Sequence, residues 1–491
     1  MNENAKISDI KRIHVVGICG VATSALAIAF HKKGIKVTGS DKGFYPPVST
    51  YLSDAGVPYY AGWHPEKLTE LVQAGEKPDF IMTGGAGTSP SNPEFLFAKE
   101  NNIPVYAWAT VLNKFFIKNK SIVITGTWGK TSISSLLSYI MINAGLAPSY
   151  FSGGLSLSHP TGELTDSEWS VVEGDEYQTA IWDKKPKFAY YAPTHLLLTS
   201  VSWDHADLYP TEKEYFAAFE KLVSEIPEES KGGMILYCKD NEGAKKVLGG
   251  EEVRGTKKVV TYGKLDADYT YSNIKPSRNG LTFTITHNGK NYEIKTPMLG
   301  RFNVENVTAC FAMAVEIGIT PESVISSILK FKGIRRRLEK RLDGDENSKG
   351  AGKKVTVFDC HAPTPEKATS SLESIREVYD KKIIAIFEPN IGGRQRESIS
   401  MYDNAFKDAD IILIPHFTKV KIDPNEKDRP LEGDELAEYI SKTHKDVRYI
   451  DDDEKIIEAA VSLVNEGDCL VFLGSHGFRG MIEDAVKKLE N

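Results

Sequence analysis

The residues with the clearest chemical meaning lie in the segment Gly126–Thr131, which reads Gly-Thr-Trp-Gly-Lys-Thr. The β-branched run 122–124 before it predicts a buried parallel strand, and the apolar spacing of 133–141 after it predicts a helix. A glycine turn between a strand and a helix gathers backbone N–H groups and the positive end of a helix dipole at one point. In such a loop, Lys130 can reach a β- or γ-phosphate and the Thr131 hydroxyl can bind Mg²⁺. The segment therefore predicts a site for a magnesium nucleoside triphosphate, although isoleucine replaces the first glycine of the general motif.

Acidic and imidazole side chains follow two later predicted strands. The strand 169–172 ends at Glu173, and the strand 196–199 leads to Asp204 and His205. Because the carboxyl ends of parallel strands share one edge of a sheet, Glu173 is placed to make a second Mg²⁺ contact beside the phosphate loop. His205 could ligate a cation or hold a phosphate oxygen. A solvated face for the acidic run and a structural role for the histidine are the alternatives.

Two further groups could contact a nucleotide. Asn303 and Asn306 lie three residues apart at the start of a predicted helix, where amide side chains can read a purine edge. Helix capping is the alternative for Asn303. The cationic cluster 335–337 beside Glu339 is either a solvated surface or the source of a domain-closing arginine for a triphosphate.

The first predicted strand leads into a second glycine loop. Strand 13–16 ends at this loop and a helix over 23–32 follows, which is the β-α-β opening of nucleotide-binding folds. The loop consists of Gly17, Ile18, Cys19 and Gly20. Because Cys19 replaces a glycine of the dinucleotide fingerprint, both phosphate binding and close helix–strand packing explain the remaining glycines. Asp41, after the second strand, could accept a hydrogen bond from a ribose or cap a turn.

The alternation of strands and helices predicts an α/β protein of three domains. These are a Rossmann-like N-terminal domain (1–114), a central P-loop ATPase-like domain (115–335) and a C-terminal Rossmann-like domain (336–491). Four short strands with period-two alternation predict a small antiparallel appendage to the central domain, at 259–262, 269–274, 281–287 and 291–295.

Composition excludes several classes of protein. The net charge of −7 argues against a nucleic-acid-binding surface. The five scattered cysteines lack any CxxC spacing, which predicts free thiols rather than a disulfide framework or a zinc site. The polar start of the chain lacks the apolar core of a secretory signal, and no apolar run approaches the ~20 residues that span a bilayer. We therefore expect a cytoplasmic protein without membrane insertion.

Over essentially its whole length, the sequence resembles the Mur ligases, the ATP-dependent amide-forming enzymes of peptidoglycan synthesis. The motifs that carry the resemblance are Gly126–Thr131, Glu173, Asp204-His205, Gly300–Asn303, Arg336-Arg337-x-Glu339 and Asp359–Pro363. They are similar to the family's phosphate loop, acidic strand end, Asp-His pair, Gly-x-His-Asn, Arg-Arg-x-Glu and Asp-x-x-His-x-Pro motifs. The sequence departs from the family at Trp128, Ser200 and Phe302.

The resemblance implies a mechanism and a set of site residues. Within the family, the sequence is similar to the branch that acts on the carboxylate of UDP-N-acetylmuramate, with ATP and Mg²⁺ forming an acyl phosphate that an amine then attacks. The implied catalytic residues are Lys130, Glu173 and His205, with Thr131, Glu173 and His205 as metal ligands. The implied ATP-binding residues are Gly126, Thr127, Gly129, Lys130, Thr131, Ser132, Asn303, Arg337 and Asp359. The implied contacts of the UDP-sugar are Gly17, Ile18, Cys19 and Gly20.

The resemblance also implies an incoming amine that is an amino acid or short peptide; the expected one is L-alanyl-γ-D-glutamyl-meso-diaminopimelate, with L-alanine as the alternative. Three arginines in loops after strands of the third domain are expected, from charge and location, to receive its carboxylate: Arg394, Arg396 and Arg479. Two interpretations from other classes are a nicotinamide-dependent dehydrogenase and a non-catalytic nucleotide switch. Cys19 counts against the dehydrogenase because it breaks the fingerprint.

Overall fold

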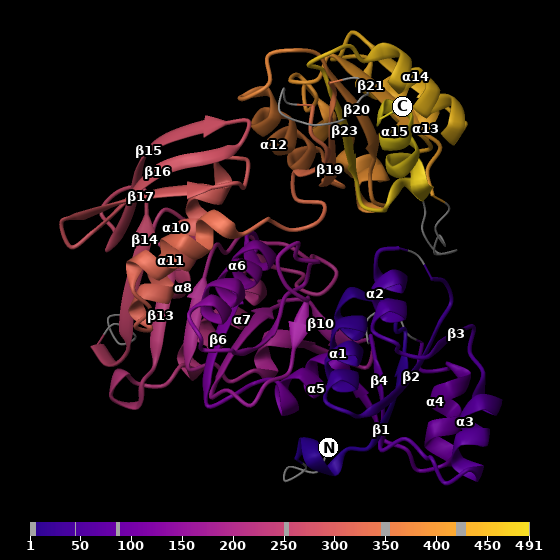
Figure 1. Cartoon of the computed structure of the whole chain (residues 1–491), viewed down its shortest axis with the longest axis vertical. Coiled ribbons are helices and arrows are strands. Elements are labelled where there is room, and N and C mark those ends of the chain that lie inside the picture. Colours follow the sequence, from indigo (N-terminus) through magenta and orange to yellow (C-terminus); the bar gives the residue numbers. More distant parts are fainter. Residues whose placement is uncertain are drawn as a thin grey trace. The chain divides into compact units, whose positions relative to one another are not determined.

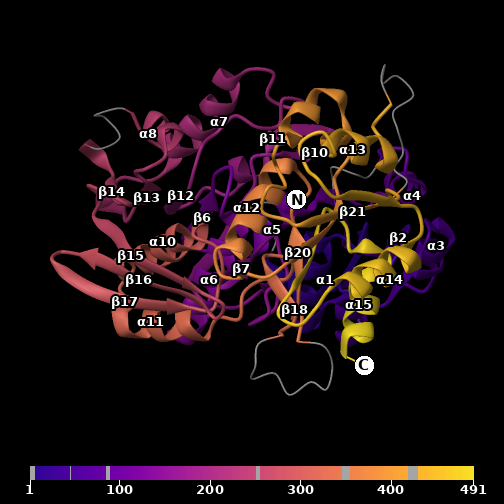
Figure 2. The same ribbon diagram turned by 90° about the horizontal axis from the view of Figure 1, so that it is seen from above.

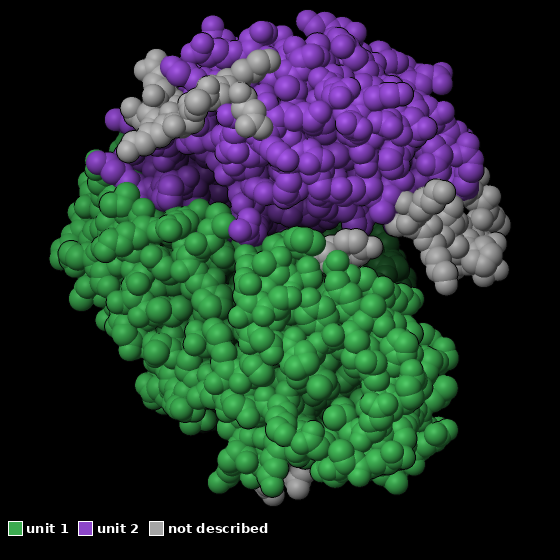
Figure 3. Space-filling model, turned by 45° about the vertical axis from the view of Figure 1, so that its right-hand side comes forward, with its two compact units in different colours: residues 1–273, 283–294, 305–332 green, residues 274–282, 295–304, 333–491 purple. Residues whose placement is uncertain are grey.

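A computed structural model describes residues 6–44, 46–84, 89–249, 255–344, 354–418 and 429–490 of the chain. The chain divides into two compact units, which Figure 3 colours separately. Unit 1 comprises residues 1–273, 283–294 and 305–332, and unit 2 comprises residues 274–282, 295–304 and 333–491. Within the described ranges, no helix has both the length and the apolar character needed to span a membrane.

The first part of unit 1 is a parallel sheet in the order β3-β2-β1-β4-β5. Helices α1 and α5 cover one face of this sheet, and α3 and α4 cover the other (Figure 1). Because both faces are covered, β1 and β4 are almost entirely buried. The elements are β1 (Arg12–Val16), α1 (Val21–Lys32), β2 (Lys36–Asp41), α2 (Val48–Asp54), β3 (Tyr59–Ala61), α3 (Pro65–Gln73), β4 (Phe80–Thr83), α4 (Pro93–Glu100), β5 (Val105–Ala107) and α5 (Trp108–Phe115).

A buried carboxylate joins several of these elements. Glu94, in the first turn of α4, accepts hydrogen bonds from the Ser40 hydroxyl, the Tyr60 hydroxyl (2.7 Å) and the His64 backbone N–H (3.0 Å). The His14 ring lies 3.5 Å from the same carboxylate. Burial alone would raise the pKa of Glu94, but the His14 ring and the other donors outweigh it and hold the pKa below its ordinary value.

This carboxylate predicts a pH-dependent contribution to stability. Because the folded pKa of Glu94 is depressed, its contribution is complete above the ordinary pKa of a glutamate and is lost as pH falls through the folded pKa. We expect Glu94→Leu to lower the free energy of unfolding by about 3 kcal/mol at pH 7, because it orphans buried donors. Glu94→Gln should lose less, and it should flatten the decline of stability between neutral and acidic pH. Urea denaturation at several pH values measures both effects; equal acid sensitivity of Glu94→Gln and the wild type would contradict them.

The second part of unit 1 contains parallel strands flanked by helices, within a sheet of order β17-β16-β15-β14-β13-β12-β6-β9-β7-β8. Figure 2 shows β14, β13, β12 and β6 in succession. The elements up to β13 are β6 (Lys120–Thr125), α6 (Lys130–Asn143), β7 (Ser149–Phe151), β8 (Gly162–Glu163), β9 (Trp169–Gly174), β10 (Gln178–Ala180), β11 (Asp183–Pro186), β12 (His195–Leu198), α7 (Glu212–Glu225) and β13 (Met234–Cys238). The later ones are α8 (Glu242–Val247), β14 (Lys258–Gly263), β15 (Tyr269–Ser277), β16 (Gly280–His287), β17 (Lys290–Thr296), α10 (Phe302–Glu316) and α11 (Pro321–Lys330). Parts of β15, β16, β17 and α10 fall within residues 274–282 and 295–304, which belong to unit 2.

The predicted antiparallel appendage is wrong in its first strand. β14 pairs in parallel with β13 along its length, and it also pairs in parallel with the start of β15. The strand therefore extends the central sheet instead of starting a separate one. Period-two alternation identifies a strand with one half-buried face, but it does not determine which neighbour the strand pairs with or in which direction.

Unit 2 contains a sheet of order β18-β19-β23-β20-β21-β22, in which only the pairing of β18 with β19 is antiparallel among the described strands. One face packs against α12 and α13, and the other against α14 and α15. The elements are β18 (Glu339–Leu342), β19 (Thr356–His361), α12 (Pro365–Arg376), β20 (Ile383–Glu388), β21 (Ile411–Pro415), α13 (Gly433–Ile440), β22 (Val447–Ile450), α14 (Asp453–Leu463), β23 (Cys469–Gly474) and α15 (Met481–Glu490). All five cysteines of the chain are free thiols.

Candidate active site

The phosphate loop lies between β6 and α6, as predicted, and two of its glycines are required by the backbone. Gly126 has a φ of 131°, and a Cβ there would collide with Thr199 and Ser200 of the chain after β12. Gly129 has a φ of 84° and is the N-cap of α6; a Cβ there would lie 2.6 Å from the Asn306 Oδ1 atom. Residues with side chains are strained at such φ values, so the loop depends on glycine at both positions.

The loop is fixed to the segment after β12 by several hydrogen bonds. The Thr127 backbone N–H donates to the Ser200 carbonyl (2.8 Å), and the Thr127 hydroxyl donates to the Ser202 carbonyl (3.0 Å). The Trp128 backbone N–H donates to the Ser200 hydroxyl oxygen (3.1 Å), and the Thr199 hydroxyl donates to the Trp128 carbonyl (2.6 Å). The Trp128 side chain is 55% exposed. Two of the departures from the family, Trp128 and Ser200, therefore contact each other.

The Lys130 ammonium is held inside the loop by a carboxylate. Its Nζ atom lies 2.9 Å and 2.7 Å from the two carboxylate oxygens of Glu176 and 2.6 Å from the Gly126 carbonyl. The side chains of Lys130 and Glu176 are 13% and 2% exposed. Burial lowers the pKa of Lys130, but the carboxylates of Glu176 and Asp175 outweigh it, so the pKa is raised. Burial raises the pKa of Glu176 against the effect of Lys130.

Glu176 was not among the predicted site residues, and strand periodicity explains why. In a continuing strand, Glu173 and Asp175 would share one face and Glu176 would point to the other. β9 ends at Gly174, however, and the chain turns, which brings Glu176 back to Lys130. The signal that could have found it is the density of carboxylates at one strand end, since a buried cluster of that kind requires cations.

Glu173 lies next to Thr131, as the predicted metal site requires. The Thr131 hydroxyl donates to the Glu173 Oε1 atom (3.1 Å), and the Gly153 backbone N–H donates to the Oε2 atom (2.6 Å). Burial raises the pKa of Glu173, although the Lys130 ammonium and these donors oppose the shift. No cluster of three or more His, Cys, Asp or Glu side chains suited to a metal occurs in the described part of the chain.

His205 lies beside Glu176. Its Nε2 atom is 3.9 Å from the Glu176 Oε1 atom, its ring packs against Tyr177 at 4.8 Å, and its φ is 56°. The Tyr177 hydroxyl in turn donates to Asp207 (2.8 Å). The three predicted metal ligands therefore fall into two groups, because Thr131 lies beside Glu173, whereas His205 lies beside Glu176, which was not predicted.

A second lysine balances the remaining carboxylate of the acidic strand end. The Lys187 Nζ atom lies 2.8 Å from Asp175 and 5.4 Å from the centre of the Tyr177 ring. Burial would raise the pKa of Asp175, but Lys187 and Lys130 lower it below its ordinary value. Three carboxylates and two ammonium groups thus share this edge of the sheet, which leaves a net negative charge that suits a divalent cation.

The first glycine loop, Gly17–Gly20, is held by the end of β2. The backbone N–H groups of Gly17 and Ile18 donate to the Ser40 carbonyl (2.8 and 3.1 Å), and the Cys19 N–H donates to the Asp41 carboxylate (2.8 Å). Asp41 therefore contacts the loop itself. Burial, with Asp41 nearby, raises the pKa of the Cys19 thiol to about 12.

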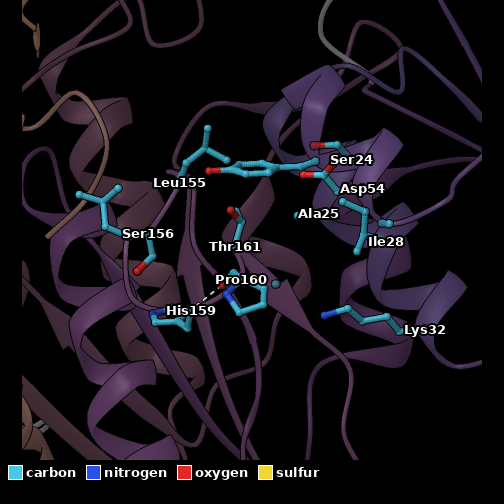
Figure 4. A pocket seen from close by; sticks show the side chains of 14 residues that line it. Ser24, Ala25, Ile28, Lys32, Asp54, Leu155, Ser156, His159, Pro160 and Thr161 are labelled. Atoms are coloured by element: carbon cyan, nitrogen blue, oxygen red, sulfur yellow. Dashed lines mark hydrogen bonds between the residues drawn. The ribbon is translucent and has the colours of Figure 1, made fainter. Parts of the chain in front are cut away.

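A cavity of about 440 Å³ lies between α1, α2 and the segment 155–162 (Figure 4). Ala25 and Ile28 of α1 face Leu155 and Pro160 across it, and the lining is mainly apolar. None of the residues that line it is a predicted site residue. The cavity volume is within the range of small-molecule sites, but the residues predicted to bind phosphate do not line it.

In unit 2, the predicted nucleotide contacts are held by local partners. The Asn303 side chain donates to the Leu299 carbonyl (2.6 Å) at the start of α10. Asp359, within β19, pairs with Arg336 (3.1 Å), and Arg337 is exposed. Arg336 also donates to the carbonyls of residues 474–476, so it ties the last loop of the sheet to Asp359. Arg337 is the predicted nucleotide contact, and Arg336, which makes these contacts, is not among the predicted site residues.

The three arginines predicted for the amine substrate differ in their surroundings. Arg394 is buried, donates to the Leu431 carbonyl (2.8 Å) and lies over the Phe417 ring. Arg479 pairs with Glu388 (2.8 Å) and with Asp453 (2.7 Å). Arg396 is exposed.

Three family models match the chain in succession. The Mur ligase family catalytic domain matches residues 12–119, the Mur ligase middle domain residues 124–314, and the Mur ligase glutamate ligase domain residues 346–476. Together they span most of the chain.

Curated relatives and solved structures agree with these matches. The UDP-N-acetylmuramate–L-alanyl-γ-D-glutamyl-meso-2,6-diaminoheptandioate ligase of Haemophilus influenzae is 28% identical, over 77% of this chain and 80% of its own length. The UDP-N-acetylmuramate–L-alanine ligase of Paenarthrobacter aurescens is also 28% identical, over 96% of this chain and 95% of its own length. The crystal structure of UDP-N-acetylmuramate-alanine ligase from Thermotoga maritima superposes with a TM-score of 0.78 at 22% identity, covering 98% of this chain and 99% of that one. It shows the same fold.

Proposed function

Because the chain belongs to the Mur ligase family of ATP-dependent amide-forming ligases, we propose that it joins the carboxylate of UDP-N-acetylmuramate to an amino acid or short peptide. The observation that carries the proposal is the juxtaposition of Lys130, Thr131 and Glu173 at one edge of the central sheet. Phosphoryl transfer consists largely of positioning and charge neutralisation, and these groups supply both. Because the family consists of ligases, its matches argue against the two alternatives from other classes, a nicotinamide-dependent dehydrogenase and a non-catalytic nucleotide switch.

In this proposal, the phosphate loop Gly126–Thr131, which forms a cradle at the start of α6, holds the reacting phosphates of ATP. The N–H groups of Thr127 and Trp128 donate to Ser200, so the backbone N–H groups at the N-terminus of α6 are assigned to the phosphates. The Lys130 ammonium stabilises the transferring group. The muramate carboxylate takes the γ-phosphoryl group, and the resulting acyl phosphate is attacked by the amine, which releases phosphate and leaves an amide. ADP and phosphate are thus the coproducts of each amide bond.

The donor atoms beside Lys130 fit Mg²⁺. The Thr131 hydroxyl and the Glu173 carboxylate are hard oxygen ligands 3.1 Å apart, and Mg²⁺ in such sites takes one or two carboxylates together with substrate phosphates. When bound, Mg²⁺ neutralises charge on the transferred group. We assign Thr131 and Glu173 to this ion, and His205 to a second cation position.

The remaining assignments are also proposals. Asn303 and Arg337 position ATP, Asp359 lies towards its ribose, and the UDP-sugar rests on the loop Gly17–Gly20. The amine carboxylate is assigned to Arg396, since the donors of Arg394 and Arg479 already serve carbonyls and carboxylates of the chain. We retain domains at 1–114, 115–335 and 336–491, which the successive family matches support.

We propose that the amine is L-alanyl-γ-D-glutamyl-meso-diaminopimelate. The support is the resemblance of Gly17–Gly20, Glu176–Ala180 and Asp204–Asp207 to ligases of that specificity. L-alanine is the competing candidate, since a relative named for it matches at the same identity over more of the chain.

Phosphate release from ATP tests the choice. With UDP-N-acetylmuramate and Mg²⁺ present, the tripeptide should give a kcat/KM at least about tenfold above that of L-alanine, because a site that pairs the extra carboxylates discriminates strongly against a substrate lacking them. Reactions without UDP-N-acetylmuramate are the control. Higher kcat/KM for L-alanine would replace the tripeptide assignment, and no release with any amine would contradict the ligase proposal for this substrate.

A further inference from the structure

The ammonium group of Lys130 has no donor left for a ligand. It carries three N–H donors, and three acceptors surround it, namely the Gly126 carbonyl and both oxygens of Glu176. A phosphate oxygen can therefore bind Lys130 only by replacing one of these acceptors. Of the two groups, the Gly126 carbonyl is part of the loop backbone, whereas Glu176 is a side chain that can turn.

The main chain of Glu176 is held in place, and its carboxylate is shielded from solvent. The Tyr209 hydroxyl donates to its main-chain carbonyl (2.7 Å), and its carboxylate is almost fully buried. A buried carboxylate that loses its cation is strongly destabilised unless another partner takes its place. The His205 Nε2 atom is 3.9 Å away from it. The neighbouring Asp175 has a different partner, Lys187, and so remains paired when Lys130 moves.

We propose that Glu176 is a positioning residue that holds Lys130 in the loop and competes with the terminal phosphates of the nucleotide for its ammonium group. When the nucleotide binds, the Lys130 ammonium group leaves Glu176 and contacts the β- and γ-phosphates. The Glu176 side chain then turns towards His205 or the second cation. This inference rests on the proposed ATP site and adds a residue to it. The inference predicts a difference between nucleotides. A nucleotide with a β-phosphate competes with Glu176 for the Lys130 ammonium, whereas AMP has no phosphate that reaches Lys130.

Binding of ADP and AMP to the full-length chain tests the competition without any chemical step. Isothermal titration in Mg²⁺ buffer, without UDP-sugar or amine, measures both affinities, and the exposed Trp128 offers a fluorescence signal for the same titration. Glu176→Gln keeps the size of the side chain but removes its charge. We expect it to bind ADP roughly tenfold more tightly than the wild type, because a charge-assisted hydrogen bond no longer competes, and to leave AMP binding unchanged.

A matched control separates competition from general charge. Asp175→Asn removes one negative charge from the adjacent residue, but the partner of Asp175 is Lys187. Its gain in ADP affinity should be clearly smaller than that of Glu176→Gln, since Asp175 acts on Lys130 only through space whereas Glu176 occupies its donors. Glu176→Asp, which keeps the charge and shortens the side chain, should give an intermediate gain and provides the test if Glu176→Gln does not fold.

The outcomes distinguish failure of the Glu176 competition from failure of the proposed nucleotide site. Tighter ADP binding by Glu176→Gln, with Asp175→Asn and AMP little changed, supports the competition. Unchanged or weaker ADP binding by folded Glu176 variants, or an equal gain in Asp175→Asn, overturns it while leaving the ligase proposal intact. If the wild type binds no ADP, the nucleotide site itself is wrong and both proposals fail.

Discussion

Replacement of Lys130 by alanine is expected to abolish nearly all ATP-dependent phosphate release. The Lys130 ammonium is the cation that the cradle offers to the transferring phosphoryl group, and loss of such a charge reduces turnover on the order of 10³-fold or more. Steady-state phosphate release with saturating UDP-N-acetylmuramate and amine measures the effect. Lys120→Ala is the matched control, because Lys120 lies at the start of β6, where its ammonium group pairs with the exposed Glu168 and lies over the Trp169 ring.

The same substitution also removes the partner of a buried carboxylate. Leaving Glu176 unpaired lowers stability by about 3–5 kcal/mol, so inactivity of Lys130→Ala alone does not separate chemistry from unfolding. The double variant Lys130→Met/Glu176→Gln removes both charges of the pair and should restore much of the stability without restoring turnover. Near-normal release of phosphate by either folded variant would rule out the assignment of Lys130.

The parts of this site that could be predicted from the sequence are those with local causes. A β-branched strand, a glycine turn and a helix follow one another in the chain, so the cradle and the position of Lys130 needed only short-range reasoning. Glu173 followed from the rule that strand ends meet at one edge of a parallel sheet. The fold class followed from the alternation of helices and strands, and the matches to Mur ligase domains agree with it.

The contacts that the sequence could not supply depend on how the chain turns after an element ends. Glu176 reaches Lys130 because the chain turns after β9 ends at Gly174, and Arg336, which pairs with Asp359, lies at a backbone position with a φ of 62°. Neither turn carries a strong residue signal. Likewise, the strand pairing of β14 is long-range, and period-two alternation contains no information on the partner.

Glu173→Gln is expected to produce the second large loss of phosphate release. The cause is weaker binding of Mg²⁺, rather than loss of a direct contact with the transferred phosphate. The Glu173 carboxylate accepts hydrogen bonds from the Thr131 hydroxyl and the Gly153 N–H. An amide can still accept from the Gly153 N–H and donate to the Thr131 hydroxyl oxygen, but it lacks the charge that Mg²⁺ requires. We expect phosphate release to fall on the order of 10²-fold and the Mg²⁺ concentration for half-maximal activity to rise. The fall should be partly reversed by high Mg²⁺, whereas that of Lys130→Ala should not.

A magnesium titration of the two variants therefore separates their roles. Glu168→Gln is the matched control, because this carboxylate is mostly exposed, pairs with Lys120 and lies just before the same strand, β9. Its magnesium dependence should equal that of the wild type, since an exposed ion pair contributes little. If Glu173→Gln retained the wild-type magnesium dependence, Glu173 would have only a structural role through Thr131 and Gly153. The ion would then have to be held on the other side of Lys130, by His205 and Glu176, which Glu176→Asp would reveal as a shift in the same titration.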